Sequence, residues 1–79
     1  MSDETWTIRV ECREAYGGEP TPRRFWLHDR AVGVTEVLDR WLAADHRYFK
    51  LKGDDGHTYI LRHDTPDDRW ELTLFQRNP

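Results

Sequence analysis

Hydrophobic and polar side chains alternate over short stretches near both ends of this chain. Near the N-terminus the apolar side chains stand at every second position, with polar ones between them: Trp6, Ile8, Val10 and Cys12. Residues 70–74 repeat this alternation near the C-terminus. A period of two is typical of a strand with one buried face. Both stretches are therefore predicted to be β-strands, with Cys12 a small residue on the buried side of the first.

Two hairpins are predicted in the middle of the chain. Residues 47–52 and 57–62 are rich in β-favouring side chains and flank the four-residue turn Gly53-Asp54-Asp55-Gly56. Residues 23–28 alternate in the same way, and the polar break at His28-Asp29-Arg30 predicts a tight turn after which the chain runs back beside them.

The segment from Val34 to Leu42 fits two structures. Its apolar residues Val34, Val37, Leu38 and Trp41 fall on one face of a helix, whereas its β-branched residues favour an extended chain. Because the segment continues a hairpin that has already begun, we predict a strand to about Asp39. A helical turn is expected at residues 40–45.

Within this segment, Asp39-Arg40-Trp41 places an acid, a guanidinium group and a large ring in succession. In a strand Asp39 and Trp41 share one face. We expect Trp41 to close the end of the core, Arg40 to point outward and Asp39 to cap a turn or pair with an arginine. The alternative is that the three residues form a recognition corner.

These elements predict an all-β fold, a small antiparallel meander of five or six strands curled into an SH3-like barrel or roll. Residues 6–76 form the single domain, flanked by a disordered tail at 1–5 and a short tail at 77–79. The segment 14–22 contains Gly17-Gly18 and two prolines and is predicted to be a loop. In a chain of 79 residues, ten aromatic side chains are expected to supply much of the core.

The reactive side chains form no recognisable catalytic or metal motif. Cys12 is the only cysteine, so neither a disulfide framework nor a cysteine zinc cluster is expected. The four histidines, His28, His46, His57 and His63, invite a metal or acid/base interpretation, and Asp64 could orient the imidazole of His63. Their spacing matches no metal motif. We therefore expect no cofactor, no metal and no enzymatic activity. The acidic N-terminus fits neither a signal peptide nor a membrane helix, and a cytoplasmic location is predicted.

The charges are unevenly distributed along a chain whose net charge is −3. Residues 23–52 carry seven basic groups against four acidic ones. This excess predicts either a basic face or a mixed surface whose charges pair across strands. Basic and aromatic residues together give the candidate binding set: Arg23, Arg24, Trp26, Arg40, Trp41, Arg47, Lys50 and Lys52. The position of the Trp26 ring distinguishes two interpretations of this set. An exposed ring would favour a binding surface, whereas a buried ring would belong to a second core layer.

Four segments carry a resemblance to known proteins: residues 22–27, 37–41, 48–50 and 59–62. Together they resemble a bacterial family of small proteins of unknown function, similar to small β domains associated with homologues of Y-family translesion DNA polymerases. The chain has Asp29-Arg30 where that pattern often has Gly-Arg. The resemblance implies an accessory role in DNA repair or replication, and it carries over no catalytic residue.

Two functions follow from the sequence. The first is a noncatalytic β-barrel interaction module, with a protein as the expected partner and with Trp26, Trp41 and residues 14–22 at its surface. The alternative is direct binding of single-stranded nucleic acid by six members of the basic and aromatic set: Arg23, Arg24, Trp26, Arg47, Lys50 and Lys52. No membrane contact is expected, and the chain is predicted to be a monomer or a weak homodimer.

Overall fold

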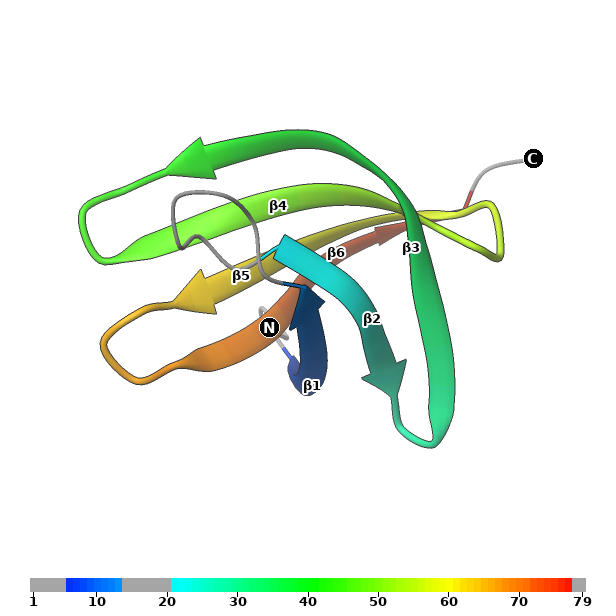
Figure 1. The fold of residues 1–79 in the computed structure, drawn as a ribbon, viewed down its shortest axis with the longest axis horizontal. Coiled ribbons are helices and arrows are strands. Elements are labelled where there is room, and N and C mark those ends of the chain that lie inside the picture. Colours follow the sequence, from blue (N-terminus) through cyan, green and yellow to red (C-terminus); the bar gives the residue numbers. More distant parts are fainter. Residues whose placement is uncertain (1–5, 14–20, 78–79) are drawn as a thin grey trace, which may run out of the picture.

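A computed structural model describes residues 6–13 and 21–77, which form six antiparallel strands closed into a barrel (Figure 1). The strands are β1 (Trp6–Arg13), β2 (Thr21–Leu27), β3 (Arg30–Leu42), β4 (His46–Gly53), β5 (Thr58–Asp64) and β6 (Arg69–Gln76). Each strand pairs with its neighbour in sequence, and β1 pairs with β6 to close the barrel. The predicted all-β antiparallel meander is therefore confirmed, with six strands and with no helix among the described residues.

Several predicted boundaries move. The predicted tail at 1–5 and most of the predicted loop at 14–22 lie outside the described residues, as does the end of the C-terminal tail. Thr21 and Pro22, which composition assigns to the loop, begin β2, and Pro22 is fully buried. His57 precedes β5 instead of belonging to it. Within the described ranges, no helix is long and apolar enough to cross a membrane.

The long strand β3 corrects the interpretation of residues 34–45. It pairs with β2 over residues 30–33 and with β4 over residues 34–42, so the helical turn predicted at 40–45 is wrong. The register of the β3–β4 ladder shifts at Thr35 and again at Leu38, where β3 has one extra residue. Each bulge delays the alternation by one position, so the apolar residues recur at a spacing that resembles a helix.

The second bulge also reverses the faces expected for Arg40 and Trp41. Arg40 pairs with the buried Phe49, and its guanidinium carbon lies 5.8 Å from the centre of that ring. Trp41 pairs with Tyr48 and is 44% exposed. The expectation that Trp41 closes the core is wrong, because one added residue moves every following side chain to the other face. Arg40 is exposed, but it lies on the face of the sheet that carries Phe49.

The core consists of inward-facing residues from five of the strands, and four of its members are aromatic. Its buried residues are Phe25, Val32, Phe49, Leu51, Tyr59, Leu61, Trp70 and Leu72. Tyr59 and Phe25 meet edge to face with their ring centres 4.9 Å apart. The aromatic core is confirmed for these four rings, whereas Trp6, Trp41 and Phe75 are about half exposed.

Asp55, in the turn between β4 and β5, joins this turn to the β2–β3 hairpin. Its carboxylate accepts a hydrogen bond of 2.5 Å from the Tyr59 hydroxyl and one of 3.0 Å from the His57 backbone N–H. The Arg30 guanidinium lies 3.4 Å from the same carboxylate. Burial alone would raise the pKa of Asp55, but the hydrogen bonds outweigh burial and hold that pKa below its ordinary value.

The barrel closes through β1, which changes its partner along its length. Residues 9–13 pair with β2, whereas residues 6–8 pair with β6. At the end of the barrel near residue 6, β1 and β2 therefore diverge. This divergence opens a cleft between the two strands.

Candidate binding cleft

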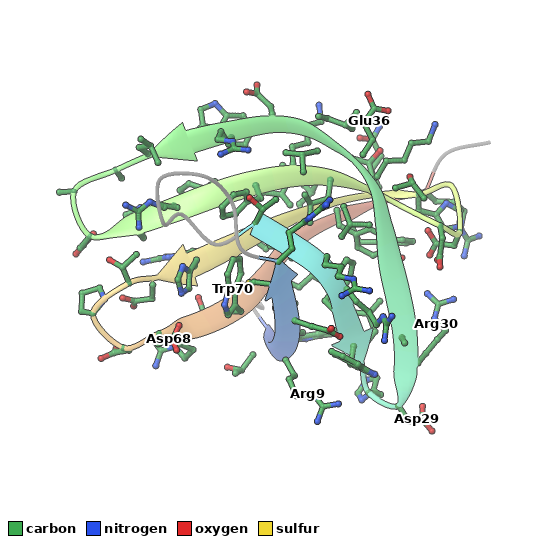
Figure 2. The ribbon with its side chains drawn as sticks, in the orientation of Figure 1. Arg9, Asp29, Arg30, Glu36, Asp68 and Trp70 are labelled. Carbon is green, nitrogen blue, oxygen red and sulfur yellow. The ribbon has the colours of Figure 1, made fainter. Side chains whose placement is uncertain are left out.

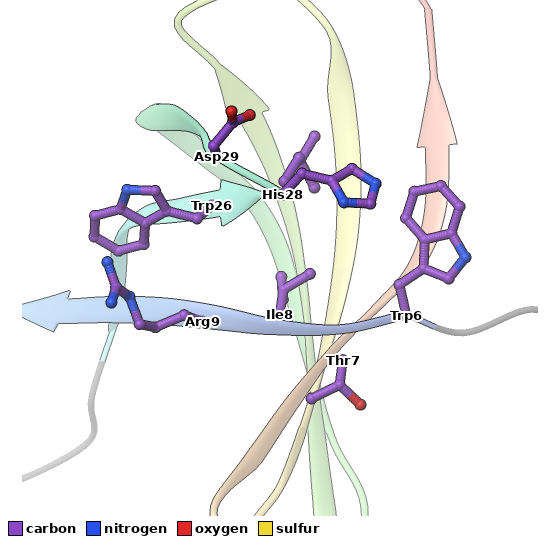
Figure 3. Close-up of a pocket in the computed structure, with 8 residues that line it drawn as sticks. Trp6, Thr7, Ile8, Arg9, Trp26, His28 and Asp29 are labelled. Carbon is purple, nitrogen blue, oxygen red and sulfur yellow. The ribbon is translucent and has the colours of Figure 1, made fainter.

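A cleft of about 880 Å³ lies where β1 and β2 diverge (Figure 3). It is lined by Trp6, Thr7, Ile8, Arg9, Trp26, Leu27, His28 and Asp29. Figure 3 shows Trp26 above Arg9 at one end, Trp6 at the other, and His28 between them. Three of the eight lining side chains are thus aromatic rings, contributed by two strands and a turn.

The β2–β3 turn places His28 in the cleft. Leu27 pairs with Arg30, so His28 and Asp29 form the two-residue turn between the strands. His28 has a positive φ of 58°, a conformation in which histidine is found more often than most residues. Its ring centre lies 5.9 Å from that of Trp6, so these two side chains meet across the gap between the strands.

Arg9 stacks on Trp26 at the other end of the cleft. Its guanidinium carbon is 4.2 Å from the centre of the Trp26 ring, within the range of a cation–π contact. Within the described parts of the chain, Arg9 takes part in no ion pair. The flat guanidinium group is therefore held by the ring, while the N–H groups on its edge remain available to a ligand.

A second hollow of about 500 Å³ adjoins the first and shares Trp6, Leu27 and His28 with it. Its remaining lining residues are Arg30, Leu72, Thr73, Leu74 and Phe75. Trp6 is 53% exposed, and Leu74 and Phe75 are each 46% exposed. Three large apolar side chains thus face solvent around one hollow, which is the usual mark of a binding surface when such residues are contiguous.

Of the candidate binding residues predicted from sequence, Trp26 alone lines this pair of hollows. It is half-buried, so it lies between the exposed and the buried state considered for it. Arg23 and Arg24 lie on β2, and each has a guanidinium nitrogen 3.6 Å from a carboxylate oxygen of Glu11. Both arginines are thereby partly neutralised by one acid.

The other predicted binding residues lie elsewhere on the barrel. Lys50 faces Asp39 across the β3–β4 ladder, and Lys52 faces Glu36. Of the last three, Arg40 and Trp41 lie near the end of β3, and Arg47 lies near the start of β4. The structure therefore distributes the eight residues over several regions instead of one face, and it sets acids opposite most of the bases.

The histidines that sequence analysis considered for metal or acid/base chemistry are dispersed. His63 is buried, stacks on Trp70 at 4.1 Å, and its Nε2 lies 2.9 Å from a carboxylate oxygen of Asp68. Asp64, the neighbour considered for orienting this ring, pairs with Arg69 instead, at 3.6 Å. Among the residues that the structure places, no group of histidine, cysteine, aspartate and glutamate could hold a metal ion.

Cys12 packs against the core and borders a hollow that also contacts Asp68 and Trp70. Burial, and secondly the charge of Asp68, raises the pKa of the Cys12 thiol. Since the thiolate is the reactive form, we expect iodoacetamide to modify Cys12 at neutral pH more slowly in the folded protein than in urea. Mass spectrometry measures the rate of modification in each state, and equal rates would contradict this prediction.

The cleft residues Trp6, Arg9 and Phe75 were missed by sequence analysis. Alternation assigned Trp6 to the buried face of its strand, and it does occupy an inward position, but at the open end of the barrel. The contact of Arg9 with Trp26 depends on the register between β1 and β2, which alternation along each strand does not determine. Sequence alternation placed Arg9 and Trp26 on outward positions of two strands, but it did not show that these two positions lie opposite each other.

No family model, curated protein or solved structure matches this chain. What the cleft binds must therefore be inferred from its shape and chemistry.

Proposed function

We propose that this chain is a noncatalytic binding module and that the two adjoining hollows receive an extended segment of a protein partner. The observation that carries the proposal is the group of half-exposed apolar side chains, Trp6, Leu74 and Phe75, around a preformed hollow. Apolar and aromatic walls with a few polar groups are typical of peptide-binding grooves. Aromatic residues are also the ones that most often dominate the energy of an interface.

The charges around the hollows favour a protein partner over nucleic acid. Two arginines and one aspartate, Arg9, Arg30 and Asp29, line them, and they lie at the same end of the barrel (Figure 2). Arg30 already contacts Asp55. Nucleic-acid binding depends on several convergent bases that replace counterions along the phosphates. The predicted basic residues are instead spread over the barrel: Arg23 and Arg24 form ion pairs with Glu11, and Lys50 and Lys52 lie opposite acids of β3.

The resemblance to small β domains associated with homologues of Y-family polymerases suggests the cellular role of this module. The partner would be a cytoplasmic protein of DNA repair or replication, and the barrel would act as an SH3-like accessory domain, as a monomer or weak homodimer. Aromatic-lined grooves bind peptide segments in SH3 domains as well, where the segment is rich in proline.

Single-stranded nucleic acid remains the second candidate because of one contact. Arg9 over Trp26, with the exposed Trp6 in the same cleft, offers two rings on which bases could stack. Binding of this kind would weaken steeply as salt is raised, whereas binding dominated by apolar contacts would change little.

The proposal is tested with a random peptide library displayed on phage and selected on the full chain. Peptides that are enriched are then synthesised, and their affinity is measured by titration calorimetry. We expect Trp6→Ala to weaken binding roughly thirtyfold, since removal of a central aromatic anchor costs about 2 kcal/mol.

Trp41→Ala is the matched control, because Trp41 is similarly exposed but does not line the hollows. It should leave the affinity unchanged, and circular dichroism establishes that both variants are folded. Failure to enrich any peptide would contradict the proposal, as would equal losses in the two variants. Salt-sensitive binding of labelled oligo(dT) or oligo(U) that Trp6→Ala abolishes would favour the nucleic-acid candidate instead.

A further inference from the structure

We infer that the segment bound in the cleft carries an acidic side chain, which Arg9 holds, a few residues from a large apolar side chain, which enters the smaller hollow. This inference rests on the proposed function and specifies the chemistry of the partner. Its two parts come from two separate observations, the state of Arg9 and the lining of the smaller hollow.

Arg9 is prepared to bind a carboxylate. The Trp26 ring, 4.2 Å from the guanidinium carbon, covers one face of the guanidinium group and fixes its plane. No described acid forms an ion pair with it, although Arg23, Arg24, Arg30 and Arg69 each have one. A fixed guanidinium plane presents two parallel N–H groups, the geometry that a carboxylate accepts in a bidentate contact. Among these arginines, Arg9 thus has its donors available in the cleft.

A carboxylate fits this site better than a phosphate. Phosphate groups carry nearly twice the charge and are usually bound by clusters of arginines. The larger hollow contains a single arginine and also Asp29, whose negative charge would repel a dianion more strongly than a monoanion. The second arginine nearby, Arg30, is held 3.4 Å from the Asp55 carboxylate.

The smaller hollow requires an apolar side chain. Most of its lining is apolar and comes from five side chains: Trp6, Leu27, Leu72, Leu74 and Phe75. Removing a large apolar side chain from water at such a surface is favourable by about 25 cal/mol for each Å² buried. A side chain the size of leucine or phenylalanine would cover the exposed parts of Leu74 and Phe75.

One extended segment is able to fill both hollows. The hollows share Trp6, Leu27 and His28, so groups bound in them are close together. In the described ladders, residues 6–8 of β1 pair only with β6, and their other edge faces the cleft. Backbone groups on a strand edge bind an extended chain by adding it as a further strand.

The test uses peptides selected on the wild-type chain, as described for the proposed function, together with versions in which each Asp or Glu is replaced by Asn or Gln. We expect the selected sequences to combine an acidic residue with Leu, Ile, Phe or Trp within a few positions. Arg9→Gln should weaken binding of the acidic peptide about tenfold, the loss expected for one charge-assisted hydrogen-bonded pair. It should leave the affinity of the amide version unchanged.

Arg13→Gln provides the charge-matched control, since Arg13 is an exposed arginine at the other end of β1 and lines neither hollow. It should have no effect on either peptide. Selected peptides without an acidic residue would overturn the inference, as would equal losses for the acidic and amide peptides in Arg9→Gln. In both cases, sensitivity to Trp6→Ala would leave the proposed function standing. If no peptide binds the wild-type chain, both fail.

Discussion

Gly53→Ala is expected to lower the free energy of unfolding by about 3 kcal/mol, the upper end of the usual cost of overpacking a core. A Cβ atom at this position would lie 2.7 Å from Val32 Cγ1 and 3.0 Å from the Tyr59 ring. It would also lie 2.7 Å from the Asp55 carboxylate. Val32 and Tyr59 are both buried, so neither side chain has space into which it could move.

Gly33→Ala is the matched control, because a Cβ atom there would meet only the exposed Asp54 carboxylate, at 3.1 Å. We expect a loss below about 1 kcal/mol for this variant, as for most surface changes. Urea unfolding followed by tryptophan fluorescence measures both. Similar stabilities for the two variants would show that the tight packing around Gly53 does not constrain the fold.

Tyr59→Phe is expected to destabilise the protein by about 2 kcal/mol at neutral pH, the range found for hydrogen bonds to charged groups. The Tyr59 hydroxyl donates to the Asp55 carboxylate at 2.5 Å, and Phe retains the ring that packs on Phe25. The loss therefore measures the hydroxyl group and not the core packing. Tyr48→Phe is the control, since Tyr48 lies on the outer face of β4.

The same pair of residues gives the stability of the wild type a dependence on alkaline pH. Burial, followed by the hydrogen bond to Asp55, raises the pKa of Tyr59 to about 12, from about 10 in an unfolded chain. Because the folded protein holds this proton more tightly, the contribution is complete below pH 10 and is lost as the pH rises towards 12.

The stability difference between wild type and Tyr59→Phe should therefore shrink by about 2 kcal/mol between pH 9 and pH 11.5. Unfolding curves at the two pH values measure this change. A difference that stays constant would show that the Tyr59 proton does not contribute. At acid pH the difference should also fall, since the lowered pKa of Asp55 stabilises the fold only while this carboxylate is ionised.

Sequence pattern was sufficient for the strands that keep a strict alternation. The hairpin around residues 53–56, the strand near Trp6 and the start of the strand near Trp70 follow directly from a period of two. The end of β3 did not, because the extra residues at Thr35 and Leu38 leave an ambiguous spacing of apolar positions. A bulge changes how far apart inward positions lie without changing their composition, so single-sequence periodicity cannot separate it from a helix.

The cleft was less predictable than the fold. Alternation identifies Trp6 as an inward side chain, but not that it lies at an open end of the barrel. It also places Leu74 inward with Trp70 and Leu72, whereas the extra residue Thr73 in β6 leaves Phe75, instead of Leu74, opposite the buried Tyr59. It also leaves the register between strands undetermined when their connection is long, so Arg9 could not be assigned to Trp26. Charge content was misleading for a related reason, since the acids opposite Lys50 and Lys52 come from another strand.

The pairing of β1 with both β2 and β6 has a consequence for the order of assembly. The β1–β6 ladder joins residues more than sixty positions apart in sequence and extends only over residues 6–8 of β1. The entropy lost in closing so long a loop is opposed by few backbone hydrogen bonds, so this seam should form after the local hairpins. The cleft exists only when the seam is closed. A partner that binds there therefore draws the chain towards its closed state, and the barrel is more completely folded when it is occupied.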